Sequence, residues 1–165
     1  MAIFNASPRG SSPGRFALWV AVALALLLLD RLTKDAIIEN LSYGMFVYVT
    51  SFFNLCHVRN TGAAFSFLGE AGGWQILVFA GLAAVVSAVC VWLIWRNARR
   101  TLFSASLALI VSGAVGNLWD RLVYGYVTDF LDFHAFGWHW PSFNVADICI
   151  CVGAVLLVFD EFRKK

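Results

Sequence analysis

Charged side chains are scarce in this sequence of 165 residues: 13% are Asp, Glu, Lys or Arg, while 61% are hydrophobic. An ordinary soluble domain carries roughly a quarter charged residues. This shortage weighs against a soluble domain and indicates an integral membrane protein. The formal net charge of +2 gives no sign of a nucleic-acid partner, because membrane topology accounts for it.

Several catalytic and metal-binding signatures are also missing. The helix-borne HExxH zinc motif is absent, and the four cysteines show neither CxxC spacing nor a disulfide framework: Cys56, Cys90, Cys149 and Cys151. Three histidines and two acids remain as possible metal ligands without diagnostic spacing: His57, His134, His139, Asp129 and Asp132. No helical histidine could activate Ser112, and Lys34 leaves a Ser-Lys pair as a weak alternative. We therefore expect no metal and no cofactor.

Long apolar runs predict four membrane-spanning helices, at about 16–35, 74–95, 102–121 and 144–161. A spanning helix needs about 20 mostly apolar residues. The first run resembles a secretory signal in length, but no small-x-small cleavage pattern follows it, so we interpret it as a retained helix. Residues 1–15 are rich in Ser, Pro, Gly and Arg and predict a flexible tail. The chain is then one integral-membrane domain, residues 1–165.

The basic residues predict the orientation of these helices, because short cytoplasmic loops are enriched in Lys and Arg. Eight of the 12 basic residues fall before the first helix, between the second and third, or after the fourth: Arg9, Arg15, Arg96, Arg99, Arg100, Arg163, Lys164 and Lys165. Both termini are therefore predicted to be cytoplasmic, and the segments 33–73 and 120–144 to face the opposite side.

The first of these outer segments contains two runs rich in β-branched and aromatic residues, 43–50 and 52–58. Such runs predict short strands, so we expect a small sheet on the membrane surface. The residues 60–67 that follow are small and predict a re-entrant or interfacial turn. The predicted fold class is an all-α membrane protein of four helices, with a small β-sheet segment and a re-entrant element between helices 1 and 2.

Acidic residues gather at the outer ends of the predicted helices. A charge at the middle of a bilayer costs about 2.5 to 3.5 kcal/mol on insertion scales, so buried acids in membrane segments usually have a function. Five acids share the outer side: Asp30, Asp120, Asp129, Asp132 and Asp147. One outward-facing site could contain several of them.

Asp129 and Asp147 are 18 residues apart, on either side of a return that contains Pro141. Asn144 is a natural N-cap that places Asp147 at the third helical position, so helix capping alone could explain this acid. The return can also bring the two carboxyl groups together. Adjacent carboxyls share one proton, which is the requirement for aspartic proteolysis.

The end of the third predicted helix carries further polar residues. Asn117 and Arg121 are four residues apart and share one helical face. Asp120 could form a helix-end ion pair with a distant cation. For Arg121 we favour a role in binding a substrate carbonyl or a phosphate-like group, because a guanidinium suits such oxygens.

Five short motifs occur in order along almost the whole chain. They are Asp30-Arg31-Leu32-Thr33-Lys34, Asn60-Thr61-Gly62-Ala63-Ala64-Phe65, Gly116-Asn117-Leu118-Trp119-Asp120-Arg121, Val127-Thr128-Asp129-Phe130 and Phe143-Asn144-Val145-Ala146-Asp147. Together they closely resemble the D-x-x-T-K, N-x-G-A-A-F, G-N-x-x-D-R, V-x-D-F and F-N-x-A-D elements of the lipoprotein signal peptidase (signal peptidase II) family. Arg31 stands where that family often has glutamine.

The resemblance implies an aspartic endopeptidase of the bacterial inner membrane with the catalytic dyad Asp129 and Asp147. It implies a pocket and supporting residues drawn from the other motifs: Asn60, Asn117, Asp120, Arg121, Asn144, Asp30 and Lys34. The implied substrate is a prolipoprotein cut just before its diacylglyceryl-modified lipobox cysteine, and no metal or cofactor is implied. We expect a monomer in contact with membrane lipid, with its active site near the periplasmic face.

Two other classes of protein compete with this interpretation. A small transporter or proton-relay protein would use intramembrane carboxylates, but it predicts acids distributed through the depth of the bilayer. A purely structural membrane subunit would leave the pairing of Asp129 with Asp147 without a reason. The clustering of acids at one side favours the peptidase.

Overall fold

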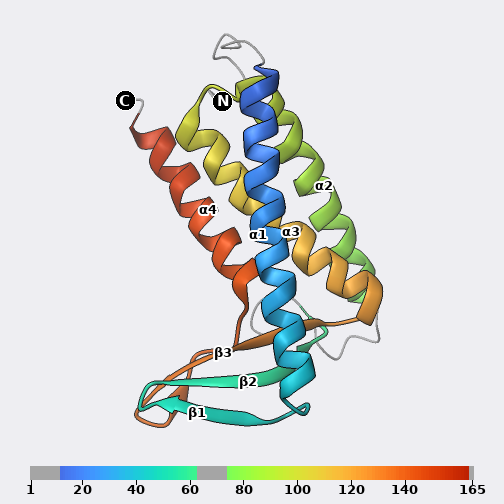
Figure 1. The fold of residues 1–165 in the computed structure, drawn as a ribbon, viewed down its shortest axis with the longest axis vertical. Helices are drawn as coiled ribbons and strands as arrows, with labels where there is room; N and C mark the ends of the chain where they lie inside the picture. Colours follow the sequence, from blue (N-terminus) through green and yellow to red (C-terminus); the bar gives the residue numbers. More distant parts are fainter. Residues whose placement is uncertain (1–11, 63–73, 164–165) are drawn as a thin grey trace.

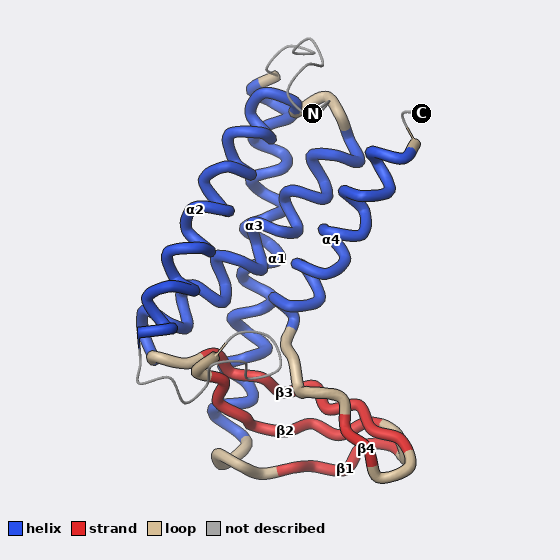
Figure 2. The backbone as a smooth tube through the Cα atoms, turned by 180° about the vertical axis from the view of Figure 1, so that it is seen from behind, coloured by secondary structure: helices blue, strands red, loops and turns tan. Residues whose placement is uncertain are grey.

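A computed structural model describes residues 12–62 and 74–163. Four helices form a bundle with a four-stranded antiparallel sheet at one end (Figures 1 and 2). The elements in chain order are α1 (Pro13–Asn40), β1 (Phe46–Thr50), β2 (Phe53–Asn60), α2 (Trp74–Asn97), α3 (Thr101–Tyr124), β3 (Val127–Ala135), β4 (Trp138–His139) and α4 (Val145–Phe162). The start of α1 and the end of α4 lie at the end of the bundle opposite the sheet, as an even number of crossings would require (Figure 1).

The helices lie where the apolar runs predict them, with two differences at α1. It begins at Pro13, inside the predicted tail, because proline is well suited to a first helical turn. It continues to Asn40 instead of residue 35, since Lys34 and Ile37 are buried by the rest of the protein. Three helices among the described residues, α1, α2 and α3, are long and apolar enough to cross a membrane. α4 is shorter, with 18 residues, and carries three acids.

The sheet differs from the prediction in its composition. The two expected strands are present as β1 and β2, but β3 and β4 come from the segment between α3 and α4. Gly125, in the left-handed region at φ 76°, ends α3 and turns the chain into β3. The predicted re-entrant turn at 60–67 lies mostly outside the described residues.

α3 is the central helix, with α1, α2 and α4 packed around it. Its buried positions are mostly small: Ser104, Ser106, Ala108, Ser112, Gly113, Ala114 and Gly116. Small residues allow helix backbones to approach closely in a membrane. A Cβ atom on Gly113 would collide with the carbonyl oxygen of Ala146, so α4 lies directly against α3 at the start of α4.

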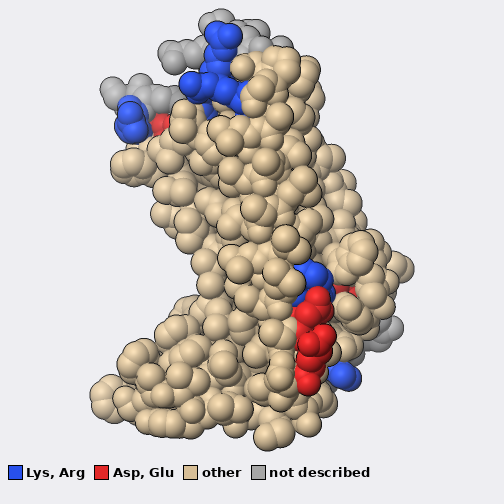
Figure 3. All heavy atoms as spheres, viewed as in Figure 1, with Lys and Arg blue, Asp and Glu red and all other residues tan. Residues whose placement is uncertain are grey.

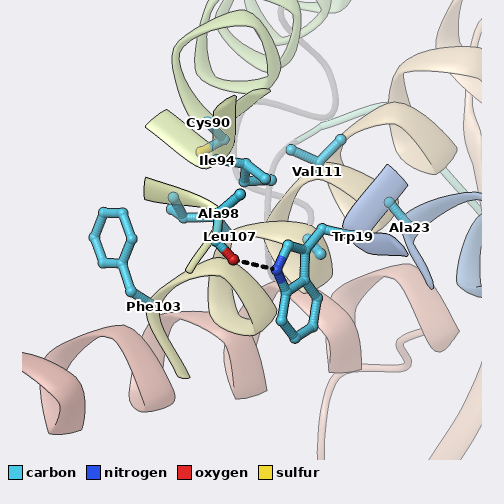
Figure 4. Packing of buried hydrophobic residues seen from close by; sticks show 9 residues of the cluster. Trp19, Ala23, Cys90, Ile94, Ala98, Phe103, Leu107 and Val111 are labelled. Atoms are coloured by element: carbon cyan, nitrogen blue, oxygen red, sulfur yellow. Dashed lines mark hydrogen bonds between the residues drawn. The ribbon is translucent and has the colours of Figure 1, made fainter. Parts of the chain in front are cut away.

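An apolar core fills the end of the bundle that lies away from the sheet. It consists of Trp19, Ala23, Cys90, Ile94, Ala98, Phe103, Leu107, Ala108 and Val111 (Figure 4). The indole Nε1 of Trp19 donates a hydrogen bond to the Ala98 carbonyl oxygen at 3.0 Å, which joins α1 to the turn between α2 and α3. Figure 3 shows Lys and Arg at this end and a belt without charged residues below them on the visible face. Such a belt fits a segment surrounded by lipid.

Candidate active site

Polar side chains from three helices and two strands meet where the bundle joins the sheet. The ten charged and amide residues of the five motifs are all buried or half-buried there, although the surrounding helix surfaces are apolar. Asp129 enters from β3 with 3% of its surface exposed, and Asp147 enters from the first turn of α4. Two acids from segments on either side of the return therefore reach one polar cluster.

Asn144 lies between these two acids and contacts both. Its side-chain Nδ2 donates to Asp129 Oδ1 at 2.7 Å, and its backbone N–H donates to Asp147 Oδ2 at 3.2 Å. Its Oδ1 accepts from the backbone N–H of Asp147 at 2.9 Å, which completes a capping box at the start of α4. The predicted N-cap is thus present, and the same residue contacts both carboxyl groups, Asp129 through its side chain and Asp147 through its backbone N–H.

Each carboxyl group also has its own amide donor. Asn60 Nδ2 donates to Asp129 Oδ2 at 3.0 Å, and Asn117 Nδ2 donates to Asp147 Oδ1 at 2.8 Å. Val58 of β2 lies opposite Asp129 of β3, and Asn60 is two residues further along β2. Asn60 is therefore a diagonal neighbour of Asp129 in this antiparallel pair. Both carboxyl groups are therefore oriented by neutral donors.

Burial, and after it the negative charge of Asp147, raise the pKa of Asp129 to about 7. Hydrogen bonds from Asn60 and Asn144 and the positive charge of Lys34 lower this pKa but do not outweigh burial. Asp129 therefore retains its proton well above the usual range of an aspartic acid. A carboxyl group that is protonated near neutral pH can act as a general acid.

A second buried cluster of charges lies beside this pair. Lys34 is fully buried, with Nζ 2.8 Å from Asp30 Oδ2 and 2.9 Å from Asp120 Oδ2. Asp30 Oδ1 also accepts from the backbone N–H of Ala146 at 2.8 Å, so it joins α1 to α4. Asp120 thus has the ion pair expected of it, and its contacts are with cations of α1.

Arg31, at the position where the resembled family often has glutamine, contributes to this cluster. Its guanidinium pairs with Asp120 at 2.5 Å and with Asp35 at 2.6 Å, and Tyr124 lies 5.4 Å from it. Arg31 therefore pairs with Asp35 within α1 and also joins α1 to Asp120 of α3. The pair of Arg31 and Asp35 was missed by the sequence analysis, although their four-residue spacing on one helix could have predicted it.

Arg121 has two hydrogen-bond partners within the protein. Its Nη2 donates to the Gly62 carbonyl oxygen at 2.9 Å, and its Nη1 donates to the Asn117 carbonyl oxygen at 3.1 Å. The predicted preference for carbonyl oxygens is present, but those oxygens belong to this chain. Arg121 therefore ties α3 to the end of β2, beside Asn60.

The other polar candidates lie away from the two acids or in unreactive settings. Asp132 is buried, accepts from Asn54 at 2.8 Å and contacts His139 at 2.9 Å. Burial raises the pKa of Cys56 to about 11, so this thiol is not a nucleophile near neutral pH. Among the described residues, no three His, Cys, Asp or Glu side chains converge as metal ligands.

The chain is similar to known proteins over most of its length. Residues 22–163 match the family model described as signal peptidase (SPase) II. A lipoprotein signal peptidase of Burkholderia thailandensis is 51% identical over 154 residues, which cover 93% of each chain. A lipoprotein signal peptidase of Ralstonia nicotianae is 53% identical over 146 residues, which cover 88% of this chain and 84% of the relative.

Solved structures give the same picture of the fold. A bacterial membrane enzyme solved at 2.3 Å superposes with a TM-score of 0.79 at 27% identity, covering 89% of this chain and 88% of the other. A second bacterial membrane enzyme, solved at 1.9 Å, gives a TM-score of 0.78 at 25% identity, covering 97% and 100%. The arrangement of bundle and sheet is therefore shared with membrane enzymes.

Proposed function

This chain belongs to the signal peptidase II family, and we propose from that membership and from the site geometry that it cleaves prolipoproteins as an aspartic endopeptidase, with Asp129 and Asp147 as its catalytic pair. The family membership supplies the class of enzyme, a lipoprotein signal peptidase. The pairing of two buried acids supplies the chemistry.

One observation carries the aspartic mechanism: a single residue, Asn144, donates hydrogen bonds to both carboxyl groups. Two carboxyls that contact the same residue lie near enough to influence each other's ionisation, and the charge of Asp147 accordingly raises the pKa of Asp129. The pair holds one proton over a range of pH and titrates as a unit.

The reaction needs both forms of the carboxyl group at once. The ionised member takes a proton from a water molecule as its oxygen attacks the scissile carbonyl carbon. The protonated member donates its proton to the carbonyl oxygen, which gives a tetrahedral diol. When the carbon–nitrogen bond breaks, the member that took the proton from water passes it to the leaving nitrogen, and the other member takes a proton from a hydroxyl of the diol as the product carboxyl forms, so the pair returns to its starting state.

The location of the pair suits a substrate anchored in lipid. The acids lie on β3 and at the start of α4, where the apolar bundle meets the sheet. Water from one side could there reach a peptide whose acyl chains remain in the bilayer. We propose that the scissile bond is the one before a diacylglyceryl-modified cysteine. All four helices would cross the bacterial inner membrane with cytoplasmic termini, which places the site near the periplasmic face and the enzyme, as a monomer, in contact with lipid.

The transporter alternative is not favoured by the distribution of charge. A proton relay would require acids at successive depths. In the described part of the chain, the buried acids gather at the sheet end of the bundle, and Asp160 and Glu161 lie at the opposite end of α4. This arrangement favours a single acidic site over a chain of acids that could pass protons across the bilayer.

The direct test is cleavage of a diacylated prolipoprotein by purified protein in micelles. Asp129→Asn and Asp147→Asn should each lower the cleavage rate by at least about 10³-fold, because each removes one half of the acid–base pair. Asp160→Asn is the matched control, since Asp160 pairs with Arg100 at the far end of the bundle. Cleavage at the normal rate by either dyad variant would refute the aspartic mechanism.

A further inference from the structure

Lys34 is a fully buried cation that touches neither catalytic carboxyl. Three oxygens surround its Nζ: Asp30 Oδ2 at 2.8 Å, Asp120 Oδ2 at 2.9 Å and Asn117 Oδ1 at 3.0 Å. An ammonium group has three N–H donors and no acceptor, so this set uses its whole capacity. The third partner, Asn117, is neutral, and it is also a hydrogen-bond donor to Asp147 of the catalytic pair.

The contact with Lys34 determines which way the Asn117 amide points. An ammonium cannot accept a hydrogen bond, so the oxygen of the amide must face Lys34 and the NH₂ group must face away from it. That NH₂ group donates to Asp147 Oδ1 at 2.8 Å. Lys34 therefore turns Asn117 into a donor toward Asp147, and a donor stabilises the ionised form of a carboxyl group.

The connection from Lys34 to Asp129 is longer. Asn144 Nδ2, which donates to Asp129 Oδ1 at 2.7 Å, also donates to Asn117 Oδ1 at 3.4 Å, so Lys34 reaches Asp129 through two amides and a long hydrogen bond. The oxygens of Asn60 and Asn144 accept from the backbone N–H groups of Gly62 and Asp147, which carry no full charge. Asp147 in addition lies in the first turn of α4, where the helix dipole favours a negative charge. The other titratable or charged groups that influence the pair are Arg121 of α3, Cys56 of β2, and Asp30 and Asp120 beside Lys34.

We propose that Lys34 is a positioning residue that, through Asn117, keeps Asp147 ionised as the base and leaves the shared proton on Asp129 as the acid. This inference rests on the proposed aspartic mechanism and adds the division of roles between the two acids. The raised pKa of Asp129, about 7, agrees with this division. A group that acts at a distance in this way changes the ionisation of the pair as well as its geometry.

The test compares two neutral replacements of Lys34. Lys34→Met removes the charge and the donor, whereas Lys34→Gln removes the charge but keeps an N–H group that can face the oxygen of Asn117. We expect kcat for prolipoprotein cleavage to fall about 10²-fold in the Met variant and about tenfold in the Gln variant, with KM changed less than about threefold. A higher kcat in the Gln variant than in the Met variant would indicate that an N–H donor at this position orients the Asn117 amide.

The pH profile of kcat separates this role from a structural one. On the acidic limb of the profile, kcat falls because the base becomes protonated. On the basic limb, kcat falls because the pair loses its shared proton. Removal of the cation should move the acidic limb to higher pH by about one unit and the basic limb by less, because Asn117 connects Lys34 to Asp147. Arg100→Met combined with Asp160→Asn removes an ion pair at the other end of the bundle and should leave both limbs in place.

A measurement on the unmodified protein keeps the inference testable if the Lys34 variants fail to fold. Hydrophobic carbodiimides add to protonated carboxyls and spare carboxylates. At about pH 6, one unit below the pKa of Asp129, mass spectrometry should find the adduct on Asp129. The inference would be overturned by an adduct on Asp147 or by the lack of an adduct on Asp129. It would also be overturned if a folded Lys34 variant kept both limbs of its pH profile in place. Active Asp129 or Asp147 variants would instead refute the proposed function.

Discussion

The link that Asn144 makes between the two acids can be separated from its role as a helix cap. Asn144→Ser keeps a good N-cap, because serine and asparagine cap helices about equally well, but its short side chain cannot reach Asp129. Asn144→Ala removes the cap as well. The difference between the Ser and Ala variants therefore measures the contribution of the cap. The difference between the Ser variant and the unmodified protein measures the contribution of the hydrogen bond to Asp129.

The expected magnitudes follow from the contacts. Both variants lose a 2.7 Å hydrogen bond to a carboxyl group that is 3% exposed, and such a bond stabilises the ionised form of that carboxyl by about 1.5 to 3 kcal/mol. The Ala variant loses about 1 kcal/mol more with the cap. The Asn144 bond lowers the pKa of Asp129, so its loss raises that pKa by about one unit or more. The basic limb of the pH profile should then move from near pH 7 to higher pH.

The assay is the rate of prolipoprotein cleavage between about pH 5 and pH 9, with thermal unfolding of each variant in the same micelles. We expect kcat below the basic limb to fall about 10- to 100-fold in both variants, because each loses the residue that orients the pair. The Ser variant should unfold at a higher temperature than the Ala variant. A Ser variant with the unmodified rate and the unmodified basic limb would refute the assignment of Asn144 as the link.

Three further predictions concern the unmodified enzyme and two packing contacts. The cleavage rate of the unmodified enzyme should decline as the pH rises above about 7, because Asp129 then loses the shared proton; a rate that keeps increasing to pH 9 would contradict this role. Gly116→Ala should destabilise the fold by about 1 to 3 kcal/mol in thermal unfolding, since its Cβ would lie 2.6 Å from Asp30 Oδ2, whereas Gly81→Ala, with open space around it, should be neutral or stabilising. Trp19→Phe should cost about 1 to 3 kcal/mol in the same experiment and leave the cleavage rate unchanged, because it removes a buried hydrogen bond far from the acids.

The helices were accessible to sequence analysis because each long apolar run must cross or enter the bilayer. Local chemistry also predicted Asn144 as the cap of α4, with Asp147 in its first turn. The strand β3 was missed, because its residues alternate poorly and Asp129 interrupts an apolar stretch. Pairing with β2 decides its conformation, and such pairing is a property of the folded chain.

The partners of the charged residues were predictable only in part. The spacing of Asp30 and Lys34 on α1 indicates a contact within one helix, and the structure contains it. The contacts of Lys34 with Asp120 and Asn117 join residues more than 80 positions apart, which no local pattern encodes. One partner of Arg121, the carbonyl oxygen of Gly62, is likewise within reach only in the folded chain.

Hydropathy and short-range motifs were enough to identify a helical membrane protein with two candidate acids, because burial in lipid restricts which residues a helix can carry. The orientation of those acids depends on the fold. Asn117 is a donor toward Asp147 because a lysine of another helix occupies its oxygen, and Asp129 keeps a proton because neighbouring elements exclude water from it. Hydrogen-bond direction and desolvation arise from groups that meet only when the helices and the sheet are assembled.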